Sequence, residues 1–218
     1  MLSSRAVRCA GSVRRTLTRT KCTDYEERFI SYKKVRHPLR RVEDDIAYTL
    51  LTHEEIYDKV HEIGRKIADD YREKNPVFVG VLKGCFMFMA DLIRCVDIDC
   101  EIEFMAVSSY SGTNSTGAVR IQKDLKGDIC GRHIILVEDI LDSGVTLNYL
   151  KNYLKVREPA SISIVTLLDK PARRQAPVYS DYSCFEVPDA FVVGYGLDYN
   201  EKYRNLPYIG VLKPEVYS

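Results

Sequence analysis

Hydrophobic positions along the chain follow a helical period in some segments and form continuous apolar runs in others. Between Thr52 and Asn75 the apolar residues recur at helical spacing, and Thr52 with Glu55 three residues later forms the pattern of a capping box. The sequence predicts a helix that begins after Thr52 and ends before Asn75-Pro76, because the residue before a proline disfavours helical backbone. Five short apolar runs predict buried strands, over residues 77–82, 102–107, 134–137, 162–168 and 191–193.

Helical segments alternate with these apolar runs. Residues 86–93 form one such segment, and Leu147, Leu150 and Leu154 line one face of another. Continuous apolar strands that alternate with helices are typical of a parallel sheet buried on both sides. We therefore expect an α/β domain with an open, mainly parallel sheet and helices on both faces.

Polar side chains follow each predicted strand at the point where the strand ends. Because the carboxyl ends of parallel strands meet at one edge of a sheet, side chains far apart in the sequence come together there. Any one of them alone is more commonly a solvated loop charge, but their occurrence after successive strands predicts a shared site. The set consists of Lys83, Glu138, Asp139, Asp142, Lys170 and Asp198.

Residues 138–146 hold the strongest chemical signal in the sequence. The loop 142–146 offers backbone N–H groups, two hydroxyls and a glycine at the start of a helix, an arrangement that binds phosphate. The sequence contains no Walker A motif. The adjacent carboxylates of Glu138 and Asp139 would repel a phosphate, but they suit the hydroxyls of a ribose or a hydrated Mg²⁺. Together these features indicate a phosphoribosyl site.

The composition of the 218 residues fits one soluble globular domain, with 45% hydrophobic and 29% charged residues. No apolar run reaches the roughly 18 residues that a membrane-spanning helix needs, so we expect no membrane association. The seven cysteines form no C-x-x-C pair, which argues against a disulfide framework or a zinc site and favours a reducing, cytoplasmic compartment.

The positive charge is concentrated at the N-terminus. Residues 1–23 contain six Lys and Arg and no acidic residue, which is the composition of a mitochondrial transit peptide and also of a disordered basic tail. We therefore divide the chain into a basic N-terminal arm, residues 1–48, and a domain, residues 49–218. The rest of the chain beyond the first 23 residues carries 26 basic and 31 acidic side chains, which argues against a broad nucleic-acid-binding surface.

Several segments resemble a known enzyme family. The sequence Val-Glu-Asp-Ile-Leu-Asp-Ser-Gly-Val-Thr at 137–146 is similar to the phosphoribosyl-pyrophosphate motif of type I phosphoribosyltransferases. The segments 82–84, 167–171 and 191–199 narrow the resemblance to the bacterial type of hypoxanthine phosphoribosyltransferases, and the similarity also includes 203–210. The similarity runs from about Leu51 to Leu212, and it implies the type I phosphoribosyltransferase fold with a small hood contributed by the terminal segments.

The resemblance implies a reaction of purine salvage. Hypoxanthine or guanine would displace pyrophosphate from 5-phosphoribosyl-1-pyrophosphate, giving IMP or GMP with Mg²⁺ as cofactor. It also implies a homodimer or homotetramer in the cytoplasm, or in an organelle if the arm is a transit peptide, with neither nucleic acid nor membrane as a partner.

The resemblance also implies roles for individual residues, with Asp142 as the general base or hydrogen-bond acceptor at N7 of the purine. The phosphoribosyl group would be bound by Lys83, Gly84, Glu138, Asp139, Ile140, Leu141, Asp142, Ser143, Gly144, Val145 and Thr146. The purine would be bound by Lys170, Phe191, Val192 and Asp198, and the pyrophosphate by Lys83 and Arg204. Mg²⁺ would be held by Glu138, Asp139 and Asp198. Ser109 and Tyr110 would begin a flap, about residues 108–121, that closes over the reacting centre.

Two alternatives remain open at this point. One is a phosphoribosyltransferase with another acceptor, such as adenine, xanthine or a pyrimidine, although Lys170 and the Phe191-Val192 edge favour a 6-oxopurine. The other is a non-catalytic regulator that keeps the nucleotide pocket and binds RNA or a protein. A pure binding module has no need of a carboxylate such as Asp142 opposite N7, nor of a metal-linked Asp198, so we favour the enzyme.

Overall fold

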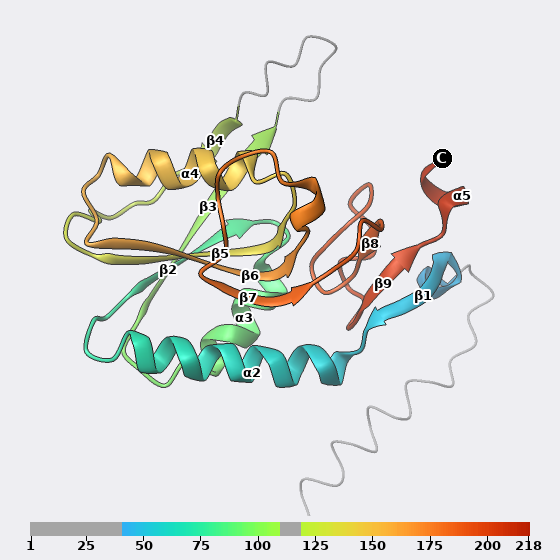
Figure 1. Cartoon of the computed structure of the whole chain (residues 1–218), viewed down its shortest axis with the longest axis horizontal. Helices are drawn as coiled ribbons and strands as arrows, with labels where there is room; N and C mark the ends of the chain where they lie inside the picture. Colours follow the sequence, from blue (N-terminus) through green and yellow to red (C-terminus); the bar gives the residue numbers. More distant parts are fainter. Residues whose placement is uncertain (1–40, 110–118) are drawn as a thin grey trace, which may run out of the picture. The chain divides into compact units, whose positions relative to one another are not determined.

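The computed structural model describes residues 41–109 and 119–218, and its main element is a six-stranded sheet (Figure 1). The strands lie in the order β4-β3-β2-β5-β6-β7, and all neighbours are parallel except β4, which is antiparallel to β3. Their bounds are β2 Val77–Leu82, β3 Glu101–Ser109, β4 Val119–Lys123, β5 His133–Leu141, β6 Ser161–Asp169 and β7 Tyr182–Glu186.

Helices cover both faces of this sheet, as Figure 1 shows. Helices α2 (His53–Asp70) and α3 (Phe86–Arg94) lie on one face, and α4 (Val145–Lys155) lies on the other. Because side chains alternate along a strand, successive strand residues join different cores. Phe78 packs in the cluster with the residues of α2 and α3, whereas Val79 packs in the cluster with the residues of α4. The predicted α/β architecture is confirmed.

The predicted helices agree with the structure where the signals are local. Helix α2 follows Thr52, whose hydroxyl accepts a hydrogen bond from the Glu55 N–H (3.2 Å) while the Glu55 carboxylate accepts one from the Thr52 N–H (2.8 Å). The predicted capping box is therefore present, and it satisfies N–H groups that a helix start leaves without partners. The apolar face predicted for α4 is buried, at Leu147, Leu150 and Leu154.

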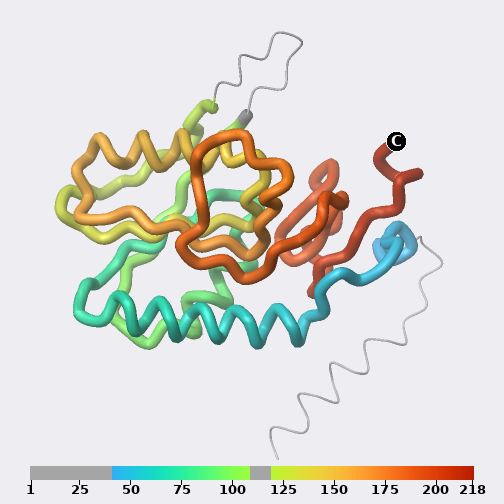
Figure 2. The backbone as a smooth tube through the Cα atoms, in the orientation of Figure 1, coloured from blue at the N-terminus to red at the C-terminus, as the bar shows by residue number. Residues whose placement is uncertain are grey.

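A second sheet of three strands is built from both ends of the described chain, in the order β1-β9-β8. Strand β1 (Ile46–Leu51) pairs antiparallel with β9 (Ile209–Leu212), which pairs antiparallel with β8 (Val192–Val193). Figure 2 shows the blue start of the described chain running beside its red end. This small sheet is the hood that the resemblance implies.

The apolar run at 191–193 is one correction to the predicted topology. We expected it to be a fifth strand of the main parallel sheet, but Val192 and Val193 form β8 of the hood. Pro188 lacks an N–H group and Gly194 has a positive φ of 103°, so the chain turns out of the main sheet before the run and turns again after it. Strands β4, β7 and β9 were not predicted, although β9 is itself a short, buried apolar run.

Ordered structure also begins earlier than residue 49. A short 3₁₀ helix, η3 (Val42–Asp45), precedes β1, and the Asp45 carboxylate accepts a buried hydrogen bond from the Tyr203 hydroxyl at 2.7 Å. Strand β1 is largely exposed, and for this reason its sequence lacks a continuous apolar run. Residues 42–48 thus belong to the hood, while residues 1–40 lie outside the described residues and the arm stays a prediction there.

The remaining elements are short. A 3₁₀ helix, η4 (Pro171–Arg173), follows β6, and α5 (Pro214–Tyr217) ends the chain. No helix in the described ranges is both long enough and apolar enough to cross a membrane.

Candidate active site

Two neighbouring pockets lie at the carboxyl edge of the main sheet. The wider pocket encloses about 370 Å³, and its lining includes Lys170, Phe191 and Asp198. The narrower pocket encloses about 90 Å³ and is lined by residues of the segment from Glu138 to Leu147. Asp142 lines both pockets. A ligand that fills both would therefore pass directly beside this carboxylate.

The narrow pocket is formed where β5 turns into α4. Gly144 occupies the N-cap position with a left-handed φ of 78° and provides no side chain to cap the helix. A Cβ at this position would lie only 2.6 Å from Val178, so the turn depends on glycine. The Val145 N–H donates to the Ser143 hydroxyl at 3.5 Å, and the other N–H groups of the first turn, together with the helix dipole, favour an anion. The pocket can therefore hold a single phosphate group.

Glu138 and Asp139 lie inside β5, before its last residue Leu141, and not after the strand as the sequence analysis predicted. Oε2 of Glu138 is buried and has no hydrogen-bond partner among the described residues. Burial, together with the charge of Asp139, raises the pKa of Glu138 well above its usual range. Burial also raises the pKa of Asp139 to about 6, although the Ile140 N–H and the Arg204 guanidinium oppose this shift. Burial of two adjacent carboxylates is energetically unfavourable, and such groups are typical of a site that binds hydroxyls or a cation.

Mg²⁺ fits this set of donors only together with substrate oxygens. Within residues 41–109 and 119–218, no group of three or more His, Cys, Asp or Glu side chains could hold a metal ion by itself. Mg²⁺ commonly uses one or two carboxylates and completes its shell with water and substrate phosphates. The unpartnered Glu138 oxygen and the adjacent Asp139 are compatible with that mode of binding.

The loop after β2 packs directly against these carboxylates. A Cβ at Gly84 would lie 1.6 Å from Oδ2 of Asp139, and a Cβ at Gly196 would lie 2.1 Å from the Gly84 carbonyl oxygen. The peptide bond between Leu82 and Lys83 is cis. The absence of side chains at Gly84 and Gly196 thus allows three segments that are distant in the sequence to meet at the edge of the sheet.

Cationic side chains line the same edge. One guanidinium nitrogen of Arg204, Nη2, lies 2.7 Å from Oδ1 of Asp198, and the other, Nη1, donates to the Gly196 carbonyl at 2.7 Å. The Lys83 ammonium donates to the Glu201 carboxylate at 3.0 Å. The predicted Lys83, Asp198 and Arg204 therefore come together. Glu201, which lies between Asp198 and Arg204 in the sequence, was not predicted as a site residue.

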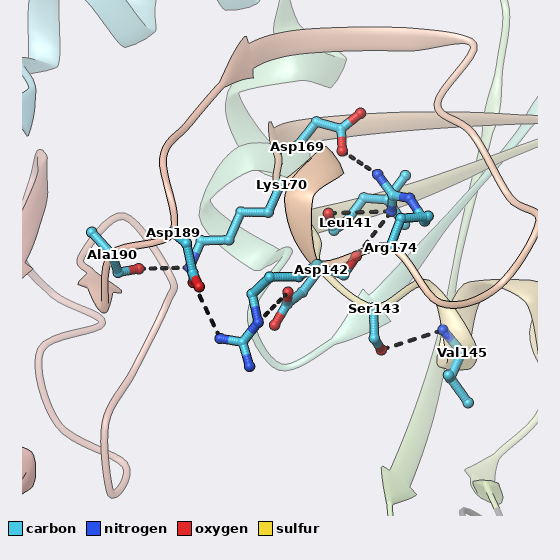
Figure 3. A network of polar contacts seen from close by, with 10 residues as sticks. Leu141, Asp142, Ser143, Val145, Asp169, Lys170, Arg174, Asp189 and Ala190 are labelled. Atoms are coloured by element: carbon cyan, nitrogen blue, oxygen red, sulfur yellow. Dashed lines mark hydrogen bonds and ion pairs between the residues drawn. The ribbon is translucent and has the colours of Figure 1, made fainter.

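The wide pocket holds a buried lysine. Lys170 is 5% exposed, and its ammonium donates to the Ala190 carbonyl at 2.6 Å (Figure 3). Burial lowers the pKa of Lys170, while the charges of Asp142 and Asp189 oppose the shift. Phe191 is partly exposed at the wall of the pocket, and its ring stacks on Tyr217 with 4.9 Å between the centroids. Val192 is buried beside it.

Two arginines that the sequence analysis missed hold the loop at Asp142. Nε of Arg173 lies 3.3 Å from Oδ1 of Asp142, and its Nη1 lies 3.4 Å from Asp189. Arg174 donates to the carbonyls of Leu141 and Asp142, and it also pairs with Asp169 (Figure 3). Both arginines directly follow the Lys170 segment, and this proximity is the signal that could have indicated them.

The predicted site residues that the structure describes thus gather at one edge of the sheet, and Ser109 reaches the same edge as the last residue of β3. Tyr110 lies outside the described residues, as does most of the predicted flap. Val145 opens α4 and is exposed. The roles of the individual residues stay predictions.

Comparison with known proteins agrees with this geometry. The model of the phosphoribosyl transferase domain family matches residues 47–200. The hypoxanthine-guanine phosphoribosyltransferase of Streptococcus pneumoniae is 52% identical over 178 residues, which cover 81% of this chain and 99% of the relative. The enzyme of the same name from Bacillus subtilis is 55% identical over 175 residues, covering 80% and 97%.

Solved structures give the same result. A crystal structure of a hypoxanthine phosphoribosyltransferase from Staphylococcus aureus matches with a TM-score of 0.79 and 50% identity, over 84% of this chain and 100% of the other. The chain belongs to the phosphoribosyltransferase family and, within it, to the group of hypoxanthine-guanine phosphoribosyltransferases. The predicted family and fold are confirmed, and the non-catalytic alternative is not favoured.

Proposed function

We propose that the protein transfers the 5-phosphoribosyl group from 5-phosphoribosyl-1-pyrophosphate to hypoxanthine or guanine, giving IMP or GMP and pyrophosphate. The observation that carries this proposal is the position of Asp142, which lines both the narrow anion pocket and the wide pocket with its buried lysine. A nucleotide needs both features, one for its phosphate and one for its base.

The phosphoribosyl group occupies the narrow pocket in this proposal. Its 5′-phosphate binds the N–H groups at the start of α4, where the loop of residues 142–146 approaches without a large side chain at Gly144. The ribose hydroxyls face Glu138 and Asp139. Carboxylates near the ribose also stabilise the electron-poor carbon that forms as the leaving group departs.

The purine occupies the wide pocket beside Lys170, Phe191 and Val192. The Lys170 ammonium is a donor without acceptor capacity, so it pairs with a 6-oxo group and not with a 6-amino group. N9 of the purine attacks C1 of the ribose, and the C1–O bond breaks with its electron pair leaving on pyrophosphate. The proton on N7 passes to the carboxylate of Asp142, which acts as the general base.

The leaving pyrophosphate is bound by Lys83 and Arg204 in this proposal. Glu138, Asp139 and Asp198 are the residues that would hold Mg²⁺, directly or through the ribose and pyrophosphate oxygens. The bound ion would neutralise the charge that builds up on the leaving group. Assembly as a homodimer or homotetramer and a cytoplasmic location are parts of the same proposal.

An initial-rate panel tests the function. The full chain is incubated with 5-phosphoribosyl-1-pyrophosphate, Mg²⁺ and one base at a time, chosen from hypoxanthine, guanine, xanthine, adenine and uracil. We expect IMP or GMP to form together with one equivalent of pyrophosphate. If no nucleotide forms from either hypoxanthine or guanine, the proposal is wrong.

A further inference from the structure

The carboxylate of Glu201 contacts both cations that we assign to the pyrophosphate. Its Oε2 accepts a hydrogen bond from Nζ of Lys83 at 3.0 Å and lies 3.6 Å from Nη2 of Arg204. The Glu201 carboxylate thus faces the two positive charges of the leaving-group site.

The local backbone holds Glu201 in this place. Its N–H donates to Oδ2 of Asp198 at 2.9 Å, and the chain turns back on itself through a bridge between Tyr199 and Lys202. Asn200 and Glu201 both have left-handed backbone, with φ of 51° and 60°. Left-handed backbone is unfavourable for most residues other than glycine, and here the Glu201 N–H bond to Asp198 and the Tyr199–Lys202 bridge hold the turn.

We propose that Glu201 is an internal competitor of pyrophosphate, whose carboxylate occupies Lys83 and Arg204 in the empty site and is displaced when the pyrophosphate group binds. This inference rests on the proposed function, because it takes both cations as ligands of the pyrophosphate. The competitor weakens the binding of a polyanion and thereby favours release of the product after the transfer.

The ion pair between Lys83 and Glu201 is weak enough for pyrophosphate to displace the Glu201 carboxylate. The side chains of Lys83 and Glu201 are 67% and 64% exposed, and ion pairs between exposed side chains contribute little to stability. Arg204 is only 19% exposed and stays anchored by Asp198 and the Gly196 carbonyl when Glu201 moves away. A polyanion with several charges can therefore replace the single carboxylate without rebuilding the site.

The test compares two charge-neutralising variants of the full chain. Glu201→Gln removes the competing charge, and Glu62→Gln is the matched control. Glu62 is also exposed, at 61%, and pairs with a lysine, Lys59, at 2.8 Å, but it lies on α2 outside the site. The dissociation constant of pyrophosphate with Mg²⁺ is measured by titration calorimetry, and initial rates give the Michaelis constant for the substrate 5-phosphoribosyl-1-pyrophosphate.

We expect Glu201→Gln to tighten pyrophosphate binding at least about threefold and to lower that Michaelis constant by a similar factor, while Glu62→Gln changes neither. The shorter side chain in Glu201→Asp does not reach Lys83 as well. This variant should therefore lower the dissociation constant of pyrophosphate and the Michaelis constant for 5-phosphoribosyl-1-pyrophosphate by smaller factors. The effect should fade near 1 M salt, where charges are screened within about 3 Å.

Unchanged pyrophosphate binding by Glu201→Gln would show that Glu201 does not compete with pyrophosphate. Weaker binding would show that Glu201 positions the two cations, and either result would overturn the proposal. This failure is distinct from failure of the proposed function. In the first case the unmodified protein still forms IMP, whereas in the second it forms no nucleotide at all.

Discussion

Lys170→Met removes a positive charge that is buried in the wide pocket while keeping the length and apolar character of the side chain. Lys170 is 5% exposed and donates to the Ala190 carbonyl at 2.6 Å, so the ammonium is fixed before any base arrives. Opposite a 6-oxo group it forms a charge-assisted hydrogen bond. Opposite the 6-amino group of adenine it faces a second donor, and one buried group stays unsatisfied.

The size of the effect follows from that single hydrogen bond. A hydrogen bond to a charged group contributes about 1.5–3 kcal/mol, so its loss should lower kcat/KM for hypoxanthine by about 10- to 150-fold. A site built around a required hydrogen bond rejects the wrong partner by roughly 10⁴–10⁵-fold. Allowing for relaxation, we expect the unmodified protein to prefer hypoxanthine or guanine over adenine by at least about 10³-fold.

The assay measures kcat/KM for hypoxanthine, guanine and adenine in the unmodified protein, in Lys170→Met and in Lys74→Met. Lys74 is a matched control because its ammonium also donates to a backbone carbonyl, that of Asp70 at 2.7 Å, but near the end of α2. The Michaelis constant for the substrate 5-phosphoribosyl-1-pyrophosphate should stay nearly constant, because the loop from Glu138 to Thr146 is untouched.

Two results would refute this reasoning about Lys170. Comparable efficiency of the unmodified protein with adenine and hypoxanthine would remove the 6-oxopurine assignment. Equal losses for Lys170→Met and Lys74→Met would show that the effect comes from a general loss of lysine charge and not from the base pocket.

Three further predictions follow from the packing. Gly84→Ala places a methyl group 1.6 Å from Asp139, so steady-state kinetics with varied 5-phosphoribosyl-1-pyrophosphate should show a loss of at least about 10²-fold in kcat/KM; near-normal kinetics would contradict the close approach. Tyr182→Phe removes the hydrogen bond of 2.7 Å from the Tyr182 hydroxyl to Asp70. This loss should lower the free energy of unfolding by about 1–2 kcal/mol and the Tm by about 2–8 °C, with kcat unchanged. An unchanged Tm would contradict a stabilising role of this hydrogen bond. Deleting residues 1–40 should leave the Tm and kcat unchanged in calorimetry and initial rates, because both sheets form from residues 41–218; loss of folding would place the arm inside the domain.

The elements that the sequence predicted correctly depend on neighbours along the chain. The capping box at Thr52 and the apolar face of α4 involve residues three or four positions apart. The carboxyl ends of β2, β5 and β6 meet because parallel strands share an edge, so the approach of Lys83 and Lys170 to the site also followed from local patterns.

The features that the sequence did not predict depend on pairing between distant segments. Strand β8 belongs to the hood because β9 pairs with it, and a two-residue run carries no sign of that partner. Glu201 meets Lys83 across more than a hundred residues of chain, through a turn with left-handed backbone. Arg173 reaches Asp142 only because β5 and β6 lie side by side.

The central claim is that base and phosphoribosyl group meet at Asp142, and the turnover of Asp142→Asn tests it most directly. Asparagine keeps the shape of the side chain but cannot accept the N7 proton as a base. We expect kcat to fall by roughly 10²–10⁴-fold, the usual share of general acid–base catalysis, while the dissociation constant of IMP stays within about a few fold of the unmodified value. A variant that turns over at nearly the normal rate would contradict the account.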